Sequence, residues 1–239
     1  MTRAVWITIG VGIALFGLGP LLANLEWVAP MTGFGLFALG PIVAIIGTIL
    51  AGIAWWRGGR RKVFAPALVV GLLPVGVVVG VSLTSDQAPP INDISTDLED
   101  PPEFVRAAEV PELQGADLSY PESFVPIVEA HYDHLEPLVV PWPRSTVVTV
   151  AANVADEQFH EVTWIAADDR QIEAVDVSGV FHFRDDIVIR LRDTRDGGTR
   201  IDVRSRSRVG RGDMGVNAAR IERFLDALST RLANADAIE

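Results

Sequence analysis

Residues 185–208 read DDIVIRLRDTRDGGTRIDVRSRSR, and this stretch decides the fold. Apolar and charged residues alternate on both sides of Asp196-Gly197-Gly198, which is the period-two pattern of strands with one buried face. Asp and Gly tolerate the positive φ angles that a tight hairpin loop with a bulge requires. The stretch therefore predicts an antiparallel β-hairpin.

The register of this hairpin follows from keeping both apolar sets on one side of the sheet. One consistent register has these cross-strand neighbours: Leu191 with Val203, Ile189 with Ser205, Arg192 with Asp202, Asp186 with Arg208, and Arg190 with Arg204. Opposite charges across strands stabilise by roughly 0.2–1 kcal/mol, whereas the like-charged Arg190–Arg204 pair needs compensation. Glu173 or Asp176 on the preceding strand, or a bound anion, would provide it.

Two strands and two helices are expected before the hairpin. Residues 161–168 and 171–178 read as strands joined by a turn. Residues 145–159 fit a strand by propensity and a helix by the spacing of their apolar residues, and the helix is favoured. Ser119-Tyr-Pro-Glu122 looks like a capping box that opens a further helix, whose start Pro126 delays.

A C-terminal helix is expected to close the domain and to pack on the apolar side of the sheet. Asp213 is a suitable N-cap for this helix, and Arg220 falls off its apolar face. That face comprises Val216 or Asn217, Ile221, Phe224, Leu225, Leu228 and Leu232. The soluble fold class is therefore α+β, with helices on a roughly four-stranded antiparallel sheet.

The N-terminal region, residues 1–84, contains three uncharged stretches. Each is about as long as the ~20 residues that cross a bilayer as a helix, and they are residues 4–22, 31–56 and 63–83. Gly76-Val-Val-Val-Gly80 is a small-xxx-small pattern that supports contact between membrane helices, although simple glycine enrichment explains it equally well.

The basic loop Arg57-Gly-Gly-Arg-Arg-Lys62 predicts the orientation, because short positive loops stay in the cytoplasm. We therefore expect a multi-pass protein of the bacterial inner (plasma) membrane with a cytoplasmic N-terminus. The C-terminal domain then lies outside the cytoplasm, which in a Gram-negative cell is the periplasm.

Residues 85–120 are acidic and Pro-rich, which is typical of an extended tether or of a strap over the domain. The compact domain is expected at 121–239. Residues 85–239 hold 15 Arg and 30 acidic residues, and this acidity argues against nucleic acid as a partner. Cysteine is absent, which excludes thiol catalysis and Cys-based zinc sites.

Several motifs together resemble one known family, the domain of unknown function DUF1499. They are Ile172-Glu-Ala-Val-Asp, the strand from Phe183 to Arg190, Arg-Ser-Arg-Ser-Arg-Val-Gly ending at Gly210, and Asp213-Met-Gly-Val-Asn-Ala-Ala-Arg-Ile221. The resemblance covers roughly residues 90–232. It implies a membrane-anchored member with this fold, and it implies no activity, substrate or cofactor.

Two features are candidate anion-binding sites. Arg190, Arg204, Arg206 and Arg208 project from one strand face, and guanidinium groups bind phosphate or carboxylate in bidentate fashion. Asn217 lies in a Gly-rich entry to a helix N-terminus, where free N–H groups attract anions. The structural alternative is an internal salt-bridge ladder and a capped helix, in which the acid partners are Glu173, Asp176, Asp186, Asp202 and Asp213.

The sequence also offers weaker candidates. His131 and His134 have the i, i+3 spacing of a zinc pair but no third ligand, so an exposed polar face is favoured. Asp185 and Asp186 form a possible carboxylate pair for acid/base chemistry, though a structural role facing Arg184 and Arg208 is favoured. No cofactor is expected.

Three functions remain open. The favoured one is a non-enzymatic binding or scaffolding module for an anionic envelope ligand or a protein partner. The first alternative is an envelope hydrolase that uses Asp185, Asp186 or Asp213. The second is a lipid-handling domain, which would need an apolar cavity between the sheet and the last helix.

Overall fold

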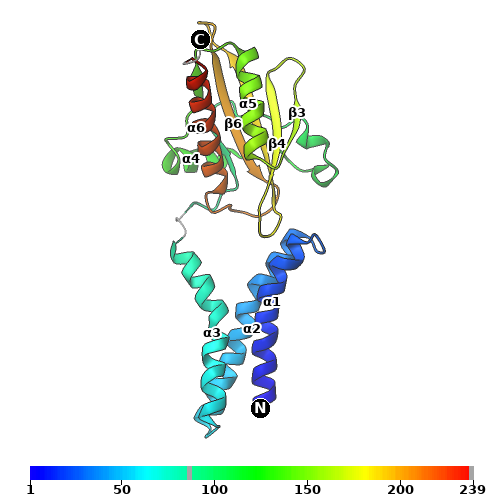
Figure 1. Cartoon of the computed structure of the whole chain (residues 1–239), viewed down its shortest axis with the longest axis vertical. Helices are drawn as coiled ribbons and strands as arrows, with labels where there is room; N and C mark the ends of the chain where they lie inside the picture. The colour runs from blue at the N-terminus through cyan, green and yellow to red at the C-terminus, as the bar shows by residue number, and fades with distance from the viewer. Residues whose placement is uncertain (85–87, 237–239) are drawn as a thin grey trace. The chain divides into compact units, whose positions relative to one another are not determined.

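The computed structural model describes residues 1–84 and 88–236. Contacts divide the chain into two compact units (Figure 1). The first comprises Met1–Ser85 with the loop Ser178–Phe183, and the second comprises Asp86–Val177 with Arg184–Glu239.

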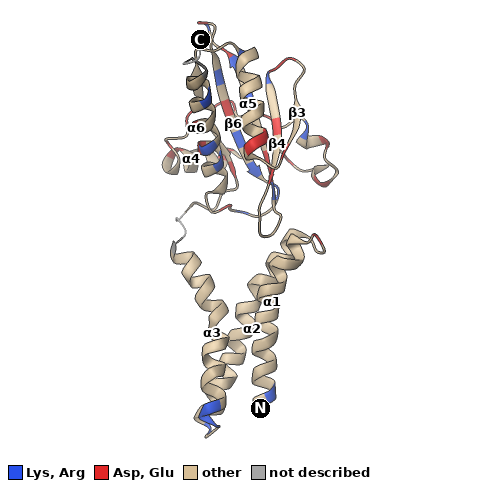
Figure 2. Cartoon of the chain, in the orientation of Figure 1, with Lys and Arg blue, Asp and Glu red and all other residues tan. Residues whose placement is uncertain are grey.

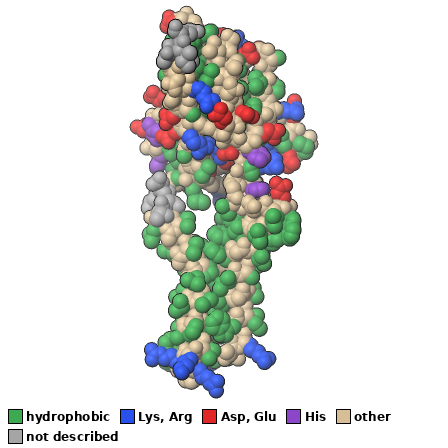
Figure 3. Space-filling view, viewed as in Figure 1, with side chains coloured by type: hydrophobic (Ala, Val, Ile, Leu, Met, Phe, Trp, Pro, Cys, Tyr) green, Lys and Arg blue, Asp and Glu red, His purple; other side chains and the backbone are tan. Residues whose placement is uncertain are grey.

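The first unit contains three long apolar helices: α1 (Thr2–Asn24), α2 (Pro30–Trp56) and α3 (Arg61–Thr84). Each is long and apolar enough to cross a membrane, so the three expected spans are confirmed as candidates. Figure 2 shows the basic residues of this unit at one end of the helices, at the N-terminus and at the α2–α3 turn. Figure 3 shows hydrophobic side chains along the outer surfaces of the helices.

Helices α1 and α2 approach each other closely through glycine. A Cβ atom on Gly12 would lie 2.6 Å from the backbone nitrogen of Ala44, and one on Gly40 would lie 2.7 Å from the carbonyl oxygen of Gly12. A Cβ on Gly76 would meet no atom within 4 Å. Helices α1 and α2 are therefore in tight backbone contact, where small residues let backbones approach, whereas Gly76 takes no part in such a contact.

The second unit is built on a six-stranded antiparallel sheet with the order β1-β6-β5-β4-β3, in which β2 also pairs with β6. The strands are β1 (Asp93–Ser95), β2 (Leu138–Val140), β3 (Glu161–Ile165), β4 (Gln171–Val177), β5 (Arg184–Asp193) and β6 (Thr199–Ser207). Strands β3 to β6 are the predicted meander. The short strands β1 and β2 were missed because three residues cannot show an alternation.

The predicted register of the β5–β6 hairpin is wrong by two residues. Leu191 lies opposite Ile201 rather than Val203, and Arg190 lies opposite Asp202 rather than Arg204. A shift of two residues leaves every side chain on the same face, so alternation alone cannot detect it. The turn decides the register: Thr194 and Gly198 close it by a backbone hydrogen bond, with Gly197 at φ +82°.

Two helices cover one face of this sheet, α5 (Arg144–Gln158) and α6 (Val216–Asp236), as Figure 1 shows. Their apolar residues form one core with the sheet, which includes Val147, Ile189 and Phe224. The helical interpretation of residues 145–159 is confirmed.

The predicted capping box is wrong. The Ser119 hydroxyl donates to the Asp117 carboxylate instead of capping a helix. A 3₁₀ turn at Glu122–Phe124 comes first, and α4 (Val125–His131) begins with Pro126 in its first turn, which is where proline is tolerated.

The other face of the sheet is covered by residues 97–120, which we call the strap. It contains the short 3₁₀ helices Ala107–Glu109 and Pro111–Leu113. Phe104 and Leu113 of the strap pack on Val188 of β5 in a second, smaller core. Ile91 and the strand Asp93–Ser95 are buried as well, so the packed domain begins near residue 91 rather than near residue 121.

Candidate functional site

The strap is held by a buried arginine. Arg204 of β6 is 1% exposed and donates to both carboxylate oxygens of Asp93, at 2.9 and 2.7 Å. It also donates to the carbonyl oxygens of Pro102 and Leu118, one near each end of the strap. Its guanidinium lies 4.8 Å from the ring centre of Phe104. These donors are used inside the protein, so Arg204 acts as the anchor of the strap.

A buried carboxylate holds the middle of the strap. Glu173 of β4 accepts hydrogen bonds from the backbone N–H groups of Val105, Arg106 and Ala107, at 2.6, 3.0 and 2.8 Å. These groups open the first 3₁₀ helix, where free donors favour a negative charge. Glu173 therefore fixes the strap. The sequence suggested instead that Glu173 compensates the charge of Arg190, and the structure does not show that contact.

The remaining candidate arginines have acidic partners of their own. Arg190 contacts Asp202, Asp97 and Asp100, each at 3.1–3.2 Å. Arg208 pairs with Asp186 at 2.8 Å. Arg206 lies 3.8 Å from Asp93 and donates to the carbonyl oxygen of Asp117. The geometry matches the salt-bridge ladder more closely than an open anion site.

Burial and hydrogen bonding compete at Asp97, the acid of the strap that meets three arginines. Burial acts to raise the pKa of this carboxyl, but the Asp100 N–H and the guanidinium groups of Arg192 and Arg200 outweigh it, so the pKa lies below its ordinary value. Asp97 therefore stays ionised at neutral pH, so its ion pairs with the arginines are formed there.

Two cavities adjoin the strap face, and neither carries a positive excess. One, of about 240 Å³, is lined by three guanidinium groups and four carboxylates: Arg106, Arg184, Arg208, Glu112, Glu161, Glu173 and Asp186. The other, of about 450 Å³, has the same balance: Arg192, Arg195, Arg200, Asp97, Glu99, Asp100 and Asp193. Neither lining favours an anion over water.

A second buried polar cluster joins α6 to the opposite face of the sheet. Arg220, which is only 3% exposed, donates to Asp176, Asp185, Ser205 and Asn217 at 2.6–3.0 Å. The prediction that Arg220 lies off the packed face is therefore wrong. Helical spacing predicts the buried face of a helix from its apolar residues. It therefore cannot predict that an arginine is buried against acidic residues of the sheet.

Asn217 lies at the centre of this second cluster. Its side-chain oxygen accepts from the Ser205 hydroxyl at 2.7 Å, and its amide group donates to Ser207 and to the Asn92 carbonyl. Asp213 caps α6 as predicted, because its carboxylate accepts from the N–H groups of Gly215 and Asn217. Parts of three of the motifs quoted above, represented by Asp176, Ser205 and Asn217, thus meet at the start of α6.

The proposed carboxylate pair does not form. Asp185 points to the α6 side, where it meets Arg220, whereas Asp186 points to the strap side, where it meets Arg208. Neighbouring residues of a strand face opposite sides of a sheet. Burial raises the pKa of Asp185 although Arg220 opposes the shift. The two carboxylates cannot share one substrate.

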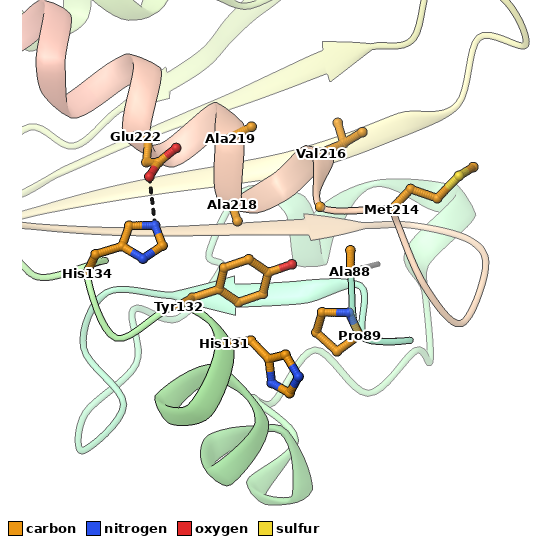
Figure 4. A pocket seen from close by; sticks show the side chains of 11 residues that line it. Ala88, Pro89, His131, Tyr132, His134, Met214, Val216, Ala218, Ala219 and Glu222 are labelled. Atoms are coloured by element: carbon orange, nitrogen blue, oxygen red, sulfur yellow. Dashed lines mark ion pairs between the residues drawn. The ribbon is translucent and has the colours of Figure 1, made fainter. Parts of the chain in front are cut away.

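A groove of about 440 Å³ lies between α4 and the start of α6 (Figure 4). One wall is apolar and the other carries imidazole and phenol groups; the lining residues are Ala88, Pro89, His131, Tyr132, His134, Met214, Gly215, Val216, Ala218, Ala219 and Glu222. Ligand pockets of ~300–1,000 Å³ are commonly apolar with a few convergent polar groups. This groove fits that description better than the two strap cavities do.

The polar groups of the groove are held in place. His134 Nε2 lies 2.7 Å from the Glu222 carboxylate across the groove, and His131 Nδ1 lies 3.0 Å from the Ile127 carbonyl (Figure 4). Burial, and to a lesser extent the charge of Asp213, raises the pKa of Tyr132, so its hydroxyl stays protonated. Among residues 1–84 and 88–236, no group of three or more His, Cys, Asp or Glu is arranged to hold a metal ion.

The sequence pointed to His131 and His134 but not to their setting. Tyr132, Met214 and Glu222 were not predicted as site residues. The groove brings together residues from three distant segments, 88–89, 131–134 and 214–222. No local spacing predicts such a meeting.

These features define an α+β domain carried on three helices that are able to span a membrane. A family model described as "Protein of unknown function (DUF1499)" matches residues 93–228. The chain therefore belongs to the DUF1499 family, as its motifs indicated. No curated protein and no solved structure matches the chain.

Proposed function

We propose that this chain is a membrane-anchored, non-enzymatic binding module whose ligand lies in the α4–α6 groove. The proposal rests on the two-sided lining of that groove. Met214, Val216 and Ala219 are apolar residues of its lining, and His131 and Tyr132 supply polar groups to the same groove. A ligand that satisfies both walls has an apolar body and a hydrogen-bonding head.

The ligand class that fits is an amphiphile of the cell envelope. An inorganic or carbohydrate anion would need unpaired guanidinium groups, and Arg190, Arg204 and Arg208 are occupied by Asp202, Asp93 and Asp186. The binding of an apolar chain is favoured by a free energy that is proportional to the apolar area it removes from water. The proposal therefore moves the ligand site from the arginine face to the groove.

The setting that we propose is the inner membrane, with the second unit outside the cytoplasm. The basic residues near the N-terminus and those of the α2–α3 turn lie at the same end of the helices (Figure 2), and such positive ends favour the cytoplasmic side. In this proposed setting, the groove would lie in the compartment where envelope amphiphiles occur.

Photo-crosslinking in nanodiscs tests this function. The full chain is placed in phosphatidylcholine–phosphatidylglycerol nanodiscs that contain a phosphatidylglycerol with a diazirine in its acyl chain, and adducts are mapped by mass spectrometry. Adducts are expected on residues 131–134 and 218–222. Ala219→Trp, which fills the groove, should remove them, and Ser229→Trp, on an exposed position of the same helix, should not.

Two results would overturn the proposal. One is the absence of adducts at residues 131–134 in a preparation whose membrane helices are labelled. The other is labelling that Ala219→Trp leaves unchanged, which would make the groove a site for a protein segment or for no ligand.

A further inference from the structure

Residues 208–216, which we call the β6–α6 loop and which include the first residue of α6, expose apolar side chains. Val209, Met214 and Val216 are 41%, 71% and 49% exposed, and Arg211 between them is exposed as well. Exposed apolar residues close together mark sites of contact with proteins or membranes. The short segment that joins α3 to the second unit favours the membrane over a protein partner.

The start of the second unit runs beside this loop. The Asp213 N–H donates to the carbonyl oxygen of Ile91 at 3.2 Å, and the Asn92 side chain donates to the carbonyl oxygen of Gly210 at 3.0 Å. A Cβ atom on Gly215 would lie 3.4 Å from the Cβ of Ala88. The loop is therefore fixed next to the first described residue of its unit.

The covalent chain limits how far this loop can lie from the bilayer. The apolar helix α3 ends at Thr84, and Ala88 follows four residues later. A residue spans at most ~3.3–3.6 Å, so Ala88 lies no more than about 14 Å from the end of α3. A hydrocarbon core of ~30 Å within a bilayer of ~40–45 Å leaves a headgroup layer of about 5–8 Å on each side. This limit holds for every orientation of the two units.

We propose that the β6–α6 loop docks on the lipid surface from which α3 emerges, with Val209, Met214 and Val216 in the interface. Apolar side chains at that depth leave water, and an adjacent arginine keeps its charge among the headgroups while its stem lies in the apolar layer. Anionic lipids attract that charge. The loop is thus a second, reversible contact with the membrane in addition to the helices.

Spin-label depth measurements test this contact on the full chain in phosphatidylcholine–phosphatidylglycerol nanodiscs. The chain contains no cysteine, so Met214→Cys and Val209→Cys each introduce a unique label. Val139→Cys is the matched control: Val139 is 61% exposed and pairs with Arg200, at the opposite end of β6. At positions 214 and 209, collisions with a water-soluble nickel chelate should fall several-fold below those at position 139, and collisions with oxygen should rise.

Equal nickel and oxygen accessibilities at positions 214 and 139 would overturn the proposal. So would labels at position 214 that are shielded from both reagents, because that pattern means contact with protein. Met214 and Val216 also line the groove, so a variant has to separate the two contacts. Ala219→Trp should abolish labelling of the groove and leave the depth at position 214 unchanged, which separates the two proposals.

Discussion

Arg204 and Asp93 form a bidentate ion pair in which both side chains are 1% exposed. The pair joins β6 to β1, and the same arginine binds both ends of the strap through Pro102 and Leu118. Burial raises the pKa of Asp93, and the hydrogen bond and charge of Arg204 only partly oppose that shift. The negative charge of the buried Asp93 carboxylate is therefore stabilised by Arg204.

Arg204→Met should destabilise the second unit by about 3–5 kcal/mol, the usual cost of leaving one partner of a buried pair alone. Thermal or denaturant unfolding of the full chain in detergent, followed by the fluorescence of its tryptophans, measures the loss. Arg223→Met on the exposed side of α6 is the control and should stay within about 0.5 kcal/mol of the wild type. Equal effects of the two changes would contradict the anchoring role of Arg204.

Asp185 should make stability fall as the pH rises. Burial raises the folded-state pKa of this carboxyl above 3.8, its ordinary value, in spite of Arg220. The folded state then holds the proton longer than the unfolded state does, so the contribution of Asp185 is fully present below pH 3.8 and is lost as the pH rises through the folded pKa. Asp185→Asn removes this dependence.

The measurement compares the unfolding free energy of the wild type with that of Asp185→Asn from about pH 3.5 to 7. The advantage of the wild type over the variant should shrink with rising pH and then level off. An advantage that grows over this range would show that Arg220 lowers the pKa of Asp185 by more than burial raises it.

The sequence predicted the parts of the fold that rest on local pattern. Alternation around Asp196-Gly197-Gly198 predicted the hairpin, apolar spacing predicted α6, and Asp213 was correctly identified as its cap. The register was wrong because a shift by two residues preserves the alternation. Local pattern thus determines elements and faces, but not which residues of two strands meet.

The candidate site was harder to predict because it depends on contacts between distant segments. The arginines of β5 and β6 were correctly placed on one face, but their partners Asp93, Asp97 and Asp100 lie in a segment that composition describes only as acidic and Pro-rich. Local pattern cannot show that such a segment folds back onto the sheet. The groove could not be predicted for the same reason, because segments distant in the sequence form it.

Gly40 should tolerate no side chain. A Cβ there would lie 2.7 Å from atoms of Gly12 and Phe16, so Gly40→Ala forces α1 and α2 apart and should cost about 1–3 kcal/mol. Gly35→Ala on the same helix is the control, since its Cβ meets nothing within 4 Å and alanine favours the helix by up to ~1 kcal/mol. Thermal unfolding in nanodiscs should rank Gly40→Ala below the wild type and Gly35→Ala at or above it. The reverse order would disprove the close contact.

The absence of cysteine also allows a direct test of orientation. Val139→Cys lies on an exposed strand of the second unit, and Arg60→Cys lies in the α2–α3 turn. If the basic turn is cytoplasmic, a membrane-impermeant maleimide added to intact spheroplasts should label position 139, and position 60 only after permeabilisation.

Labelling of position 60 alone would reverse the topology and place the groove in the cytoplasm. The envelope amphiphile would then have to be replaced by a cytoplasmic ligand, whereas the β6–α6 loop would still meet a lipid surface, because its distance from the end of α3 is the same on either side of the membrane.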